Sequence, residues 1–183
     1  MTETGNSESV WVFGYGSLIW RPGIAFHERR VARIHGWTRR FWQGSHDHRG
    51  LPDAPGRVVT LVPKPGASCE GVAYRVAAHL AAAVFEGLDH REKNGYQRYD
   101  VHLEFRRGGT DAGVAYIAPA DNHAFLGPAP IDEVVAQIVR SAGPSGSNSD
   151  YLCQLEAALR RWEIEDAHVF ELAKRLRERM KAG

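Results

Sequence analysis

Two short segments of the chain carry residue types that an enzyme site requires. In the first, Val10–Ile19, an apolar stretch runs into the turn Gly14-Tyr15-Gly16-Ser17. Its two glycines allow consecutive backbone N–H groups to surround a small anion such as a carboxylate. In the second, Leu88–Tyr96, Glu92 follows a helix-forming stretch. A carboxylate beside a bound substrate can act as a general base, so the two segments together predict an enzyme site.

The spacing of apolar residues before Glu92 indicates where its side chain points. Leu80, Val84 and Leu88 recur every four positions, as on the buried face of a helix, which we predict over 77–93. Glu92 is the next member of this row, near the C-terminal end of the helix. Burial and the helix dipole would both raise its pKa. The alternative is a solvated glutamate among charged neighbours, which is the usual place for this residue type.

The glycine turn also has a simpler interpretation, because glycine interrupts loops in proteins of every class. The turn lacks the acidic residue that a dinucleotide site needs at a set distance and the Gly-Lys-Ser/Thr of a phosphate loop. A smaller anion such as a carboxylate fits better. His46 and His48 could ligate a metal, but without a second ligand pair they are more typical of a polar loop. The aromatic and basic segment Trp37–Trp42 is explained more simply by a two-sided strand than by nucleic-acid binding.

Composition limits the remaining possibilities. The chain has 183 residues and a net charge of +1, from 23 Lys and Arg against 22 Asp and Glu. We expect a disordered tail over 1–9 and a single domain over 10–183, with no general attraction to nucleic acid or anionic membranes. The N-terminus lacks a secretory pattern, and no apolar run approaches ~18 residues. Since Cys69 and Cys153 are isolated, we expect a cytoplasmic protein with free thiols.

The elements that must position these residues are strands followed by helices. The sequence predicts strands over 10–13, 31–43, 57–62, 71–76, 99–105 and 113–118. It predicts helices over 77–93 and 131–142, and two further apolar stripes from Tyr151 to Trp162 and from Val169 to Met180, with Ser147 or Ser149 as a cap. This order indicates an α+β fold, most simply a mixed sheet or a small closed barrel with packed helices.

Eight segments of the chain match the pattern of one known family: Val12–Trp20, Arg40–Ser45, Asp47–Gly50, Pro55–Val62, Gly71–Arg75, Arg91–Tyr96, Leu126–Pro130 and Gly143–Gly146. Together they resemble the ChaC family of glutathione-specific γ-glutamylcyclotransferases. They follow the family's order from Val10 to the C-terminal helices. One residue departs from the pattern: Asn94 stands where the family often has glycine.

The resemblance implies a γ-glutamylcyclotransferase-like fold, a small mixed β-barrel with packed helices, and a lyase-type cleavage of glutathione into 5-oxoproline and cysteinylglycine. It implies Glu92 as the catalytic acid and base. The substrate-binding residues that it implies are Val12, Phe13, Gly14, Tyr15, Gly16, Ser17, Leu18 and Tyr151. It implies no cofactor, no metal, and no nucleic-acid or membrane partner. A cyclotransferase for other γ-glutamyl amines or dipeptides, and a γ-glutamyl-binding sensor without turnover, remain as alternatives.

Overall fold

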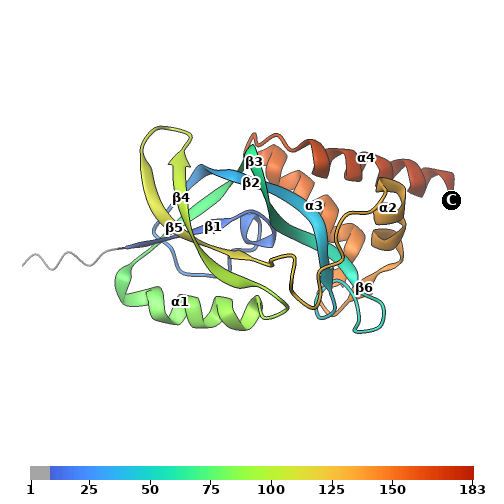
Figure 1. The fold of residues 1–183 in the computed structure, drawn as a ribbon, viewed down its shortest axis with the longest axis horizontal. Coiled ribbons are helices and arrows are strands. Elements are labelled where there is room, and N and C mark those ends of the chain that lie inside the picture. Colours follow the sequence, from blue (N-terminus) through green and yellow to red (C-terminus); the bar gives the residue numbers. More distant parts are fainter. Residues whose placement is uncertain (1–8) are drawn as a thin grey trace, which may run out of the picture.

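A computed structural model, which describes residues 9–183, contains five strands closed into a barrel (Figure 1). The strands are β1 (Val10–Gly14), β2 (Glu28–Ser45), β3 (Gly56–Val76), β4 (Gln97–Phe105) and β5 (Thr110–Ile117). Their order around the barrel is β1-β3-β2-β4-β5, and neighbours are antiparallel except β1 and β5, which are parallel. The predicted mixed barrel with packed helices is confirmed. The predicted tail over 1–9 lies, except for Ser9, outside the described residues.

β1 is buried on both of its faces, which explains why its sequence is apolar without alternation. Trp11 and Phe13 belong to the main hydrophobic core. Val12 belongs to a second cluster, with Leu88 of α1 (Ala78–Arg91). Because successive side chains of a strand point in opposite directions, β1 lies between the main core and α1. The end of β1 is therefore held close to the helix that precedes the candidate base.

β2 and β3 extend beyond the barrel as a long two-stranded ribbon (Figure 1). Residues 68–75 of β3 pair with β2 within the barrel, and residues 56–63 pair with β2 in the extension. The segment 64–67 lies between them, is exposed over 64–66, and has Gly66 at φ +80°. The prediction of two separate strands over 57–62 and 71–76 is wrong, because β2 pairs with both halves. The register shifts between His35 and Trp37 of β2, and this irregularity does not end β3.

Three helices cover the extended part of the ribbon, and α1 packs on the barrel (Figure 1). They are α2 (Ile131–Arg140), α3 (Asn148–Arg161) and α4 (Ala167–Ala182), and the short elements are the 3₁₀-helix η1 (Ser17–Ile19), β6 (Ala142–Gly143) and β7 (Gly146–Ser147). Each predicted helical segment contains a helix, although α1 and α2 end two residues before the predicted bounds of 77–93 and 131–142. Met180 is an error in the predicted stripe, since it is 65% exposed: the last turn of α4 has no buried side chain.

A buried amide fixes the start of α3 to β3. Asn148 is 0% exposed, and its side chain accepts a hydrogen bond from Arg57 N at 2.7 Å and donates one to Arg57 O at 2.8 Å. It thereby satisfies two backbone groups as a neighbouring strand would. Ser147 caps the helix by accepting a hydrogen bond from Asp150 N at 3.1 Å, which confirms one of the two predicted caps. Tyr151 follows in the first turn of α3.

We expect Asn148→Ala to lower the free energy of unfolding by about 2–4 kcal/mol, because two buried backbone groups of Arg57 would lose their partner. Urea denaturation monitored by circular dichroism measures this change. The control is Ser149→Ala, at the next position of the helix, where the side chain makes no hydrogen bond to any described residue. Unchanged stability of the Asn148→Ala protein would contradict the role of this amide.

Candidate active site

Glu92 directly follows α1 and caps its C-terminal end. Its N–H donates a hydrogen bond to Leu88 O at 2.8 Å, so the helical turn is complete and Glu92 lies in the same row as Val84 and Leu88. Those two residues are 8% and 1% exposed, and the Glu92 side chain is 18% exposed. The structure therefore places Glu92 on the buried row, where the sequence predicts it.

The surroundings of Glu92 increase its affinity for a proton. Removal from water raises the pKa of the carboxyl above the ordinary glutamate value, and the nearby Asp47 adds to the rise. Arg91 and His48 lower the pKa, and Arg91 Nε lies 3.5 Å from Glu92 Oε1. Desolvation is the largest of these effects, so the pKa lies above its ordinary value. Such a carboxyl suits a base that must later return its proton.

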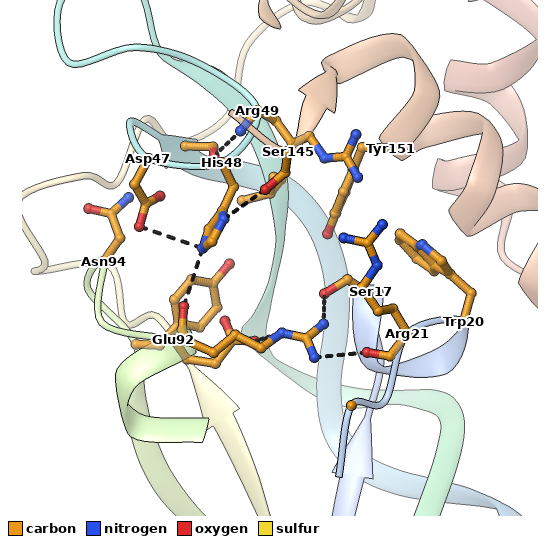
Figure 2. Close-up of a pocket in the computed structure, with 15 residues that line it drawn as sticks. Ser17, Trp20, Arg21, Asp47, His48, Arg49, Glu92, Asn94, Ser145 and Tyr151 are labelled. Carbon is orange, nitrogen blue, oxygen red and sulfur yellow. Dashed lines mark hydrogen bonds and ion pairs between the residues drawn. The ribbon is translucent and has the colours of Figure 1, made fainter. Parts of the chain in front are cut away.

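Glu92 lies where two cavities meet. The inner cavity has a volume of about 40 Å³ and is lined by Phe13, Tyr15, Gly16, Ser17, Leu18, Val59, Glu92, Tyr96, Tyr116 and Tyr151. The outer cavity, shown in Figure 2, has a volume of about 340 Å³ and is lined by Ser17, Trp20, Arg21, Gly23, Ser45, Asp47, His48, Arg49, Val58, Arg91, Glu92, Asn94, Tyr96, Ser145 and Tyr151. Four residues border both cavities: Ser17, Glu92, Tyr96 and Tyr151. A substrate spanning both would pass the carboxyl.

The turn after β1 is held in place from two sides. Arg39, a buried residue, donates from Nε to Tyr15 O at 2.7 Å, and the Tyr15 hydroxyl donates to Tyr116 O at 2.5 Å. Within the part of the chain that the structure describes, the N–H groups of Gly16 and Ser17 donate to no protein acceptor. They are therefore available to an anion in the inner cavity.

A lack of room for a side chain explains why position 16 of this turn is a glycine. Neither Gly14 nor Gly16 has a positive φ, so the strain that a positive φ would impose on other residues does not apply. A Cβ at Gly16 would lie 2.9 Å from Val59 Cγ2 and 3.2 Å from the Tyr151 hydroxyl. Any larger residue would therefore press into the wall of the inner cavity or onto Tyr151.

The predicted substrate segment lies only partly at the cavities. Phe13, Tyr15, Gly16, Ser17 and Leu18 line the inner cavity, whereas Val12 and Gly14 line neither cavity. The alternation of β1 turns Val12 toward α1, and a Cβ on Gly14 would meet the side chains of Leu18 and Tyr74. These two residues can support the turn from behind, but they are not placed to contact a ligand in either cavity.

Two tyrosines complete the edge of β3 inside the site. Tyr151 accepts a hydrogen bond from Val59 N at 3.3 Å, and Tyr96 donates one to Val59 O at 2.8 Å. Burial raises the pKa of both hydroxyls, so both remain protonated near neutral pH. Tyr151 was predicted at the site and lines both cavities. Tyr96 was not singled out, although it ends the Arg91–Tyr96 segment of the resemblance.

Arg91 connects the turn after β1 to the end of α1. Its guanidinium donates to Ser17 Oγ at 2.9 Å, to Arg21 O at 2.8 Å and to Pro22 O at 3.1 Å. Figure 2 shows the first two of these hydrogen bonds. The sequence gives no signal for this clamp, because the residues it joins are about seventy positions apart. It fixes Ser17 and Glu92 relative to one another.

The loop after β2 contributes a histidine to the cavity wall. His48 Nδ1 lies 3.0 Å from Ser145 Oγ, and His48 Nε2 lies 3.3 Å from Arg91 O and 3.7 Å from Asp47 Oδ2 (Figure 2).

Across residues 9–183, no group of three or more His, Cys, Asp or Glu side chains is arranged to hold a metal ion. The same residues include no helix that is both long and apolar enough to cross a bilayer.

Comparisons with known proteins show which family the chain belongs to. The family model for ChaC-like proteins matches residues 10–179. The chain is 42% identical to γ-glutamylcyclotransferase 2-3 of Arabidopsis thaliana, over 92% of this chain and 89% of that protein. It is 38% identical to the glutathione-specific γ-glutamylcyclotransferase of Saccharomyces cerevisiae, over 88% and 90% of the two chains.

A solved structure extends the similarity to three dimensions. The crystal structure of a γ-glutamylcyclotransferase specific to glutathione from yeast superposes with a TM-score of 0.88 at 33% identity, covering 93% of this chain and 96% of that one. Both the sequence match and the structural match therefore span the barrel and the helices. The chain belongs to the family of ChaC-like proteins.

Proposed function

We propose that this chain is a glutathione-specific γ-glutamylcyclotransferase, which cleaves glutathione into 5-oxoproline and cysteinylglycine. The observation that carries the proposal is the position of Glu92: a largely buried carboxyl with a raised pKa, at the junction of a small inner cavity and a larger outer one. Relatives with this activity in their names are similar along most of the chain.

The reaction is an internal displacement. The α-amine of the γ-glutamyl group attacks its own γ-carbonyl carbon, a new C–N bond closes the five-membered ring, and the C–N bond to cysteine breaks. The attacking ammonium loses two protons, and the departing nitrogen gains two as it becomes an ammonium. No water and no redox cofactor are consumed. Holding the two ends of the γ-glutamyl group together can supply about 7–11 kcal/mol of the barrier.

Glu92 would carry the protons between the two nitrogens. Its carboxylate would remove a proton from the substrate ammonium, and the resulting carboxylic acid would donate it to the departing nitrogen. The raised pKa favours the second step without preventing the first. Arg91 Nε, 3.5 Å from Glu92 Oε1, keeps the pKa from rising further.

The inner cavity would hold the γ-glutamyl group. The free N–H groups of Gly16 and Ser17 can bind its α-carboxylate or the oxyanion that forms on the carbonyl. The Tyr151 hydroxyl lies at the same wall and can donate a hydrogen bond there. The proposed partner is glutathione alone. The chemistry requires no metal, and both cysteines are free thiols, as expected for an enzyme of the cytoplasm.

The direct test is to incubate the purified protein with glutathione and, separately, with γ-glutamylalanine, and to quantify 5-oxoproline by mass spectrometry. We expect 5-oxoproline to form from glutathione at least about ten-fold faster than from γ-glutamylalanine, because groups beyond the γ-glutamyl unit would contribute binding energy in the transition state. Comparable rates would favour a cyclotransferase of broad γ-glutamyl specificity. No product from either, with glutathione binding intact, would favour a sensor.

We expect Glu92→Gln to lower kcat by at least about 10²-fold, because the amide cannot accept the proton of the amine. The matched control is Glu86→Gln on the exposed face of the same helix, which should keep normal activity. In the parent enzyme, the acid limb of kcat/KM should lie above the ordinary pKa of glutamate, with activity rising as Glu92 ionises.

Glu92→Gln should also change the stability of the folded protein. Because the folded-state pKa of Glu92 is raised, its ionisation costs stability as pH rises from the unfolded to the folded pKa, and this cost persists at neutral pH. The Glu92→Gln protein should therefore unfold at the same or a higher temperature than the parent near neutral pH.

Near-normal turnover in a folded Glu92→Gln protein would exclude Glu92 as the base.

A further inference from the structure

The outer cavity contains more positive charge than its own acidic residues balance. Three arginines line it: Arg21, Arg49 and Arg91. Arg91 is already engaged by Ser17 Oγ and two backbone carbonyls, and its Nε faces Glu92. Among the described residues, Arg21 and Arg49 have no carboxylate within ion-pair distance. Two guanidinium groups at this cavity therefore lack a counter-ion.

Arg49 is held rigidly in the cavity wall. The residue is 5% exposed, its Nη1 donates to Ser147 O at 3.1 Å, and its guanidinium lies 5.7 Å from the ring centroid of Tyr151. Burial, which is the largest effect, and the positive charge of Arg21 both lower the pKa of the Arg49 guanidinium. An anion between the two guanidinium groups would offset the repulsion between them.

Arg21 is anchored through its backbone, and its exposed side chain makes no hydrogen bond or ion pair with the part of the chain that the structure describes. Arg91 Nη1 holds Arg21 O at 2.8 Å, so the backbone of Arg21 has a fixed place relative to the end of α1. Figure 2 shows the guanidinium groups of Arg21 and Arg49 both directed toward Tyr151, on the side of the cavity away from Glu92. The two cations thus face the same region of the outer cavity.

We propose that Arg21 and Arg49 form a carboxylate-binding subsite that recognises the C-terminal carboxylate of the cysteinylglycine half of glutathione. The inference rests on the proposed function. The inner cavity, about 40 Å³, has room for little more than the γ-glutamyl end, so the dipeptide half must lie in the outer cavity of about 340 Å³. With the scissile carbonyl at Glu92, the far carboxylate is directed to the opposite wall.

This subsite would account for a preference for glutathione over simple γ-glutamyl compounds. Arginine binds a carboxylate through two parallel N–H···O bonds, and such charge-assisted bonds are stronger than neutral ones. γ-Glutamylalanine carries its carboxylate one residue closer to the scissile bond, where it cannot reach the same groups. The C-terminal carboxamide of glutathione has the same length as glutathione but lacks the negative charge at that end. It isolates the interaction proposed here.

The experiment compares glutathione with its C-terminal carboxamide, both in 5-oxoproline formation by the active protein and in calorimetric binding to the Glu92→Gln protein. We expect glutathione to be preferred by about 10- to 100-fold. Arg21→Gln should reduce this preference to less than about three-fold, chiefly by weakening the binding of glutathione. Arg49→Lys, which keeps the charge but loses the planar fork, should show an intermediate preference. Arg107→Gln, an exposed arginine outside this cavity, is the matched control and should keep the full preference.

The outcomes separate this inference from the proposed function. Equal losses for glutathione and its amide in both arginine variants would mean that the pair binds the γ-glutamyl end or only supports the fold, and would overturn the inference. An unchanged preference in the Arg21→Gln protein would also overturn it. A lack of 5-oxoproline from the parent protein would refute the proposed function, while the binding preference would still test the subsite.

Discussion

The mismatch in length between β1 and β3 determines where the site can form. β1 has five residues and pairs with β3 only over Val72–Val76, while β3 continues to Gly56 with β2 along its other edge. In the described residues, no strand covers the free edge of β3 at Val59. Its backbone groups are satisfied instead by the hydroxyls of Tyr151 and Tyr96. The opening left by the missing strand becomes the inner cavity, since a buried backbone edge must find other partners.

The remaining elements bring chemical groups to this opening. α1 packs on β1 through the cluster of Val12 and Leu88, and the next turn of its buried row delivers Glu92 to the junction of the two cavities. Arg91, the neighbouring residue, ties the turn after β1 to the same point. The desolvation that raises the pKa of Glu92 thus comes from the packing that positions it. Stability and chemistry oppose each other here, because a buried carboxyl costs free energy that a purely structural residue would not.

Local patterns predicted the elements and the position of Glu92, whereas the contacts that build the site are not local. The four-residue period of Leu80, Val84 and Leu88 was sufficient to place Glu92, because a single helix sets that register. The same reasoning could not find the clamp from Arg91 to Ser17, or the unpaired guanidinium groups of Arg21 and Arg49, since both depend on how segments distant in sequence meet. It also divided β3 into separate strands over 57–62 and 71–76, because a sequence pattern cannot show that β2 pairs with both halves. Tyr151 and the flanking residues Val12, Phe13 and Leu18 came from the family resemblance, whereas the turn itself was predicted from its glycines. The structure places Val12 and Gly14 behind the cavity wall.

In the proposed reaction the substrate's own amine, and not water, attacks the γ-carbonyl. The most direct measurement is mass spectrometry of the products formed from glutathione in water enriched in the heavy oxygen isotope. Attack by the amine should give 5-oxoproline and cysteinylglycine in equal amounts, with no heavy oxygen in either, because no water oxygen enters the reaction. Glutamate carrying one heavy oxygen as the main γ-glutamyl product would show hydrolysis and would exclude attack by the amine.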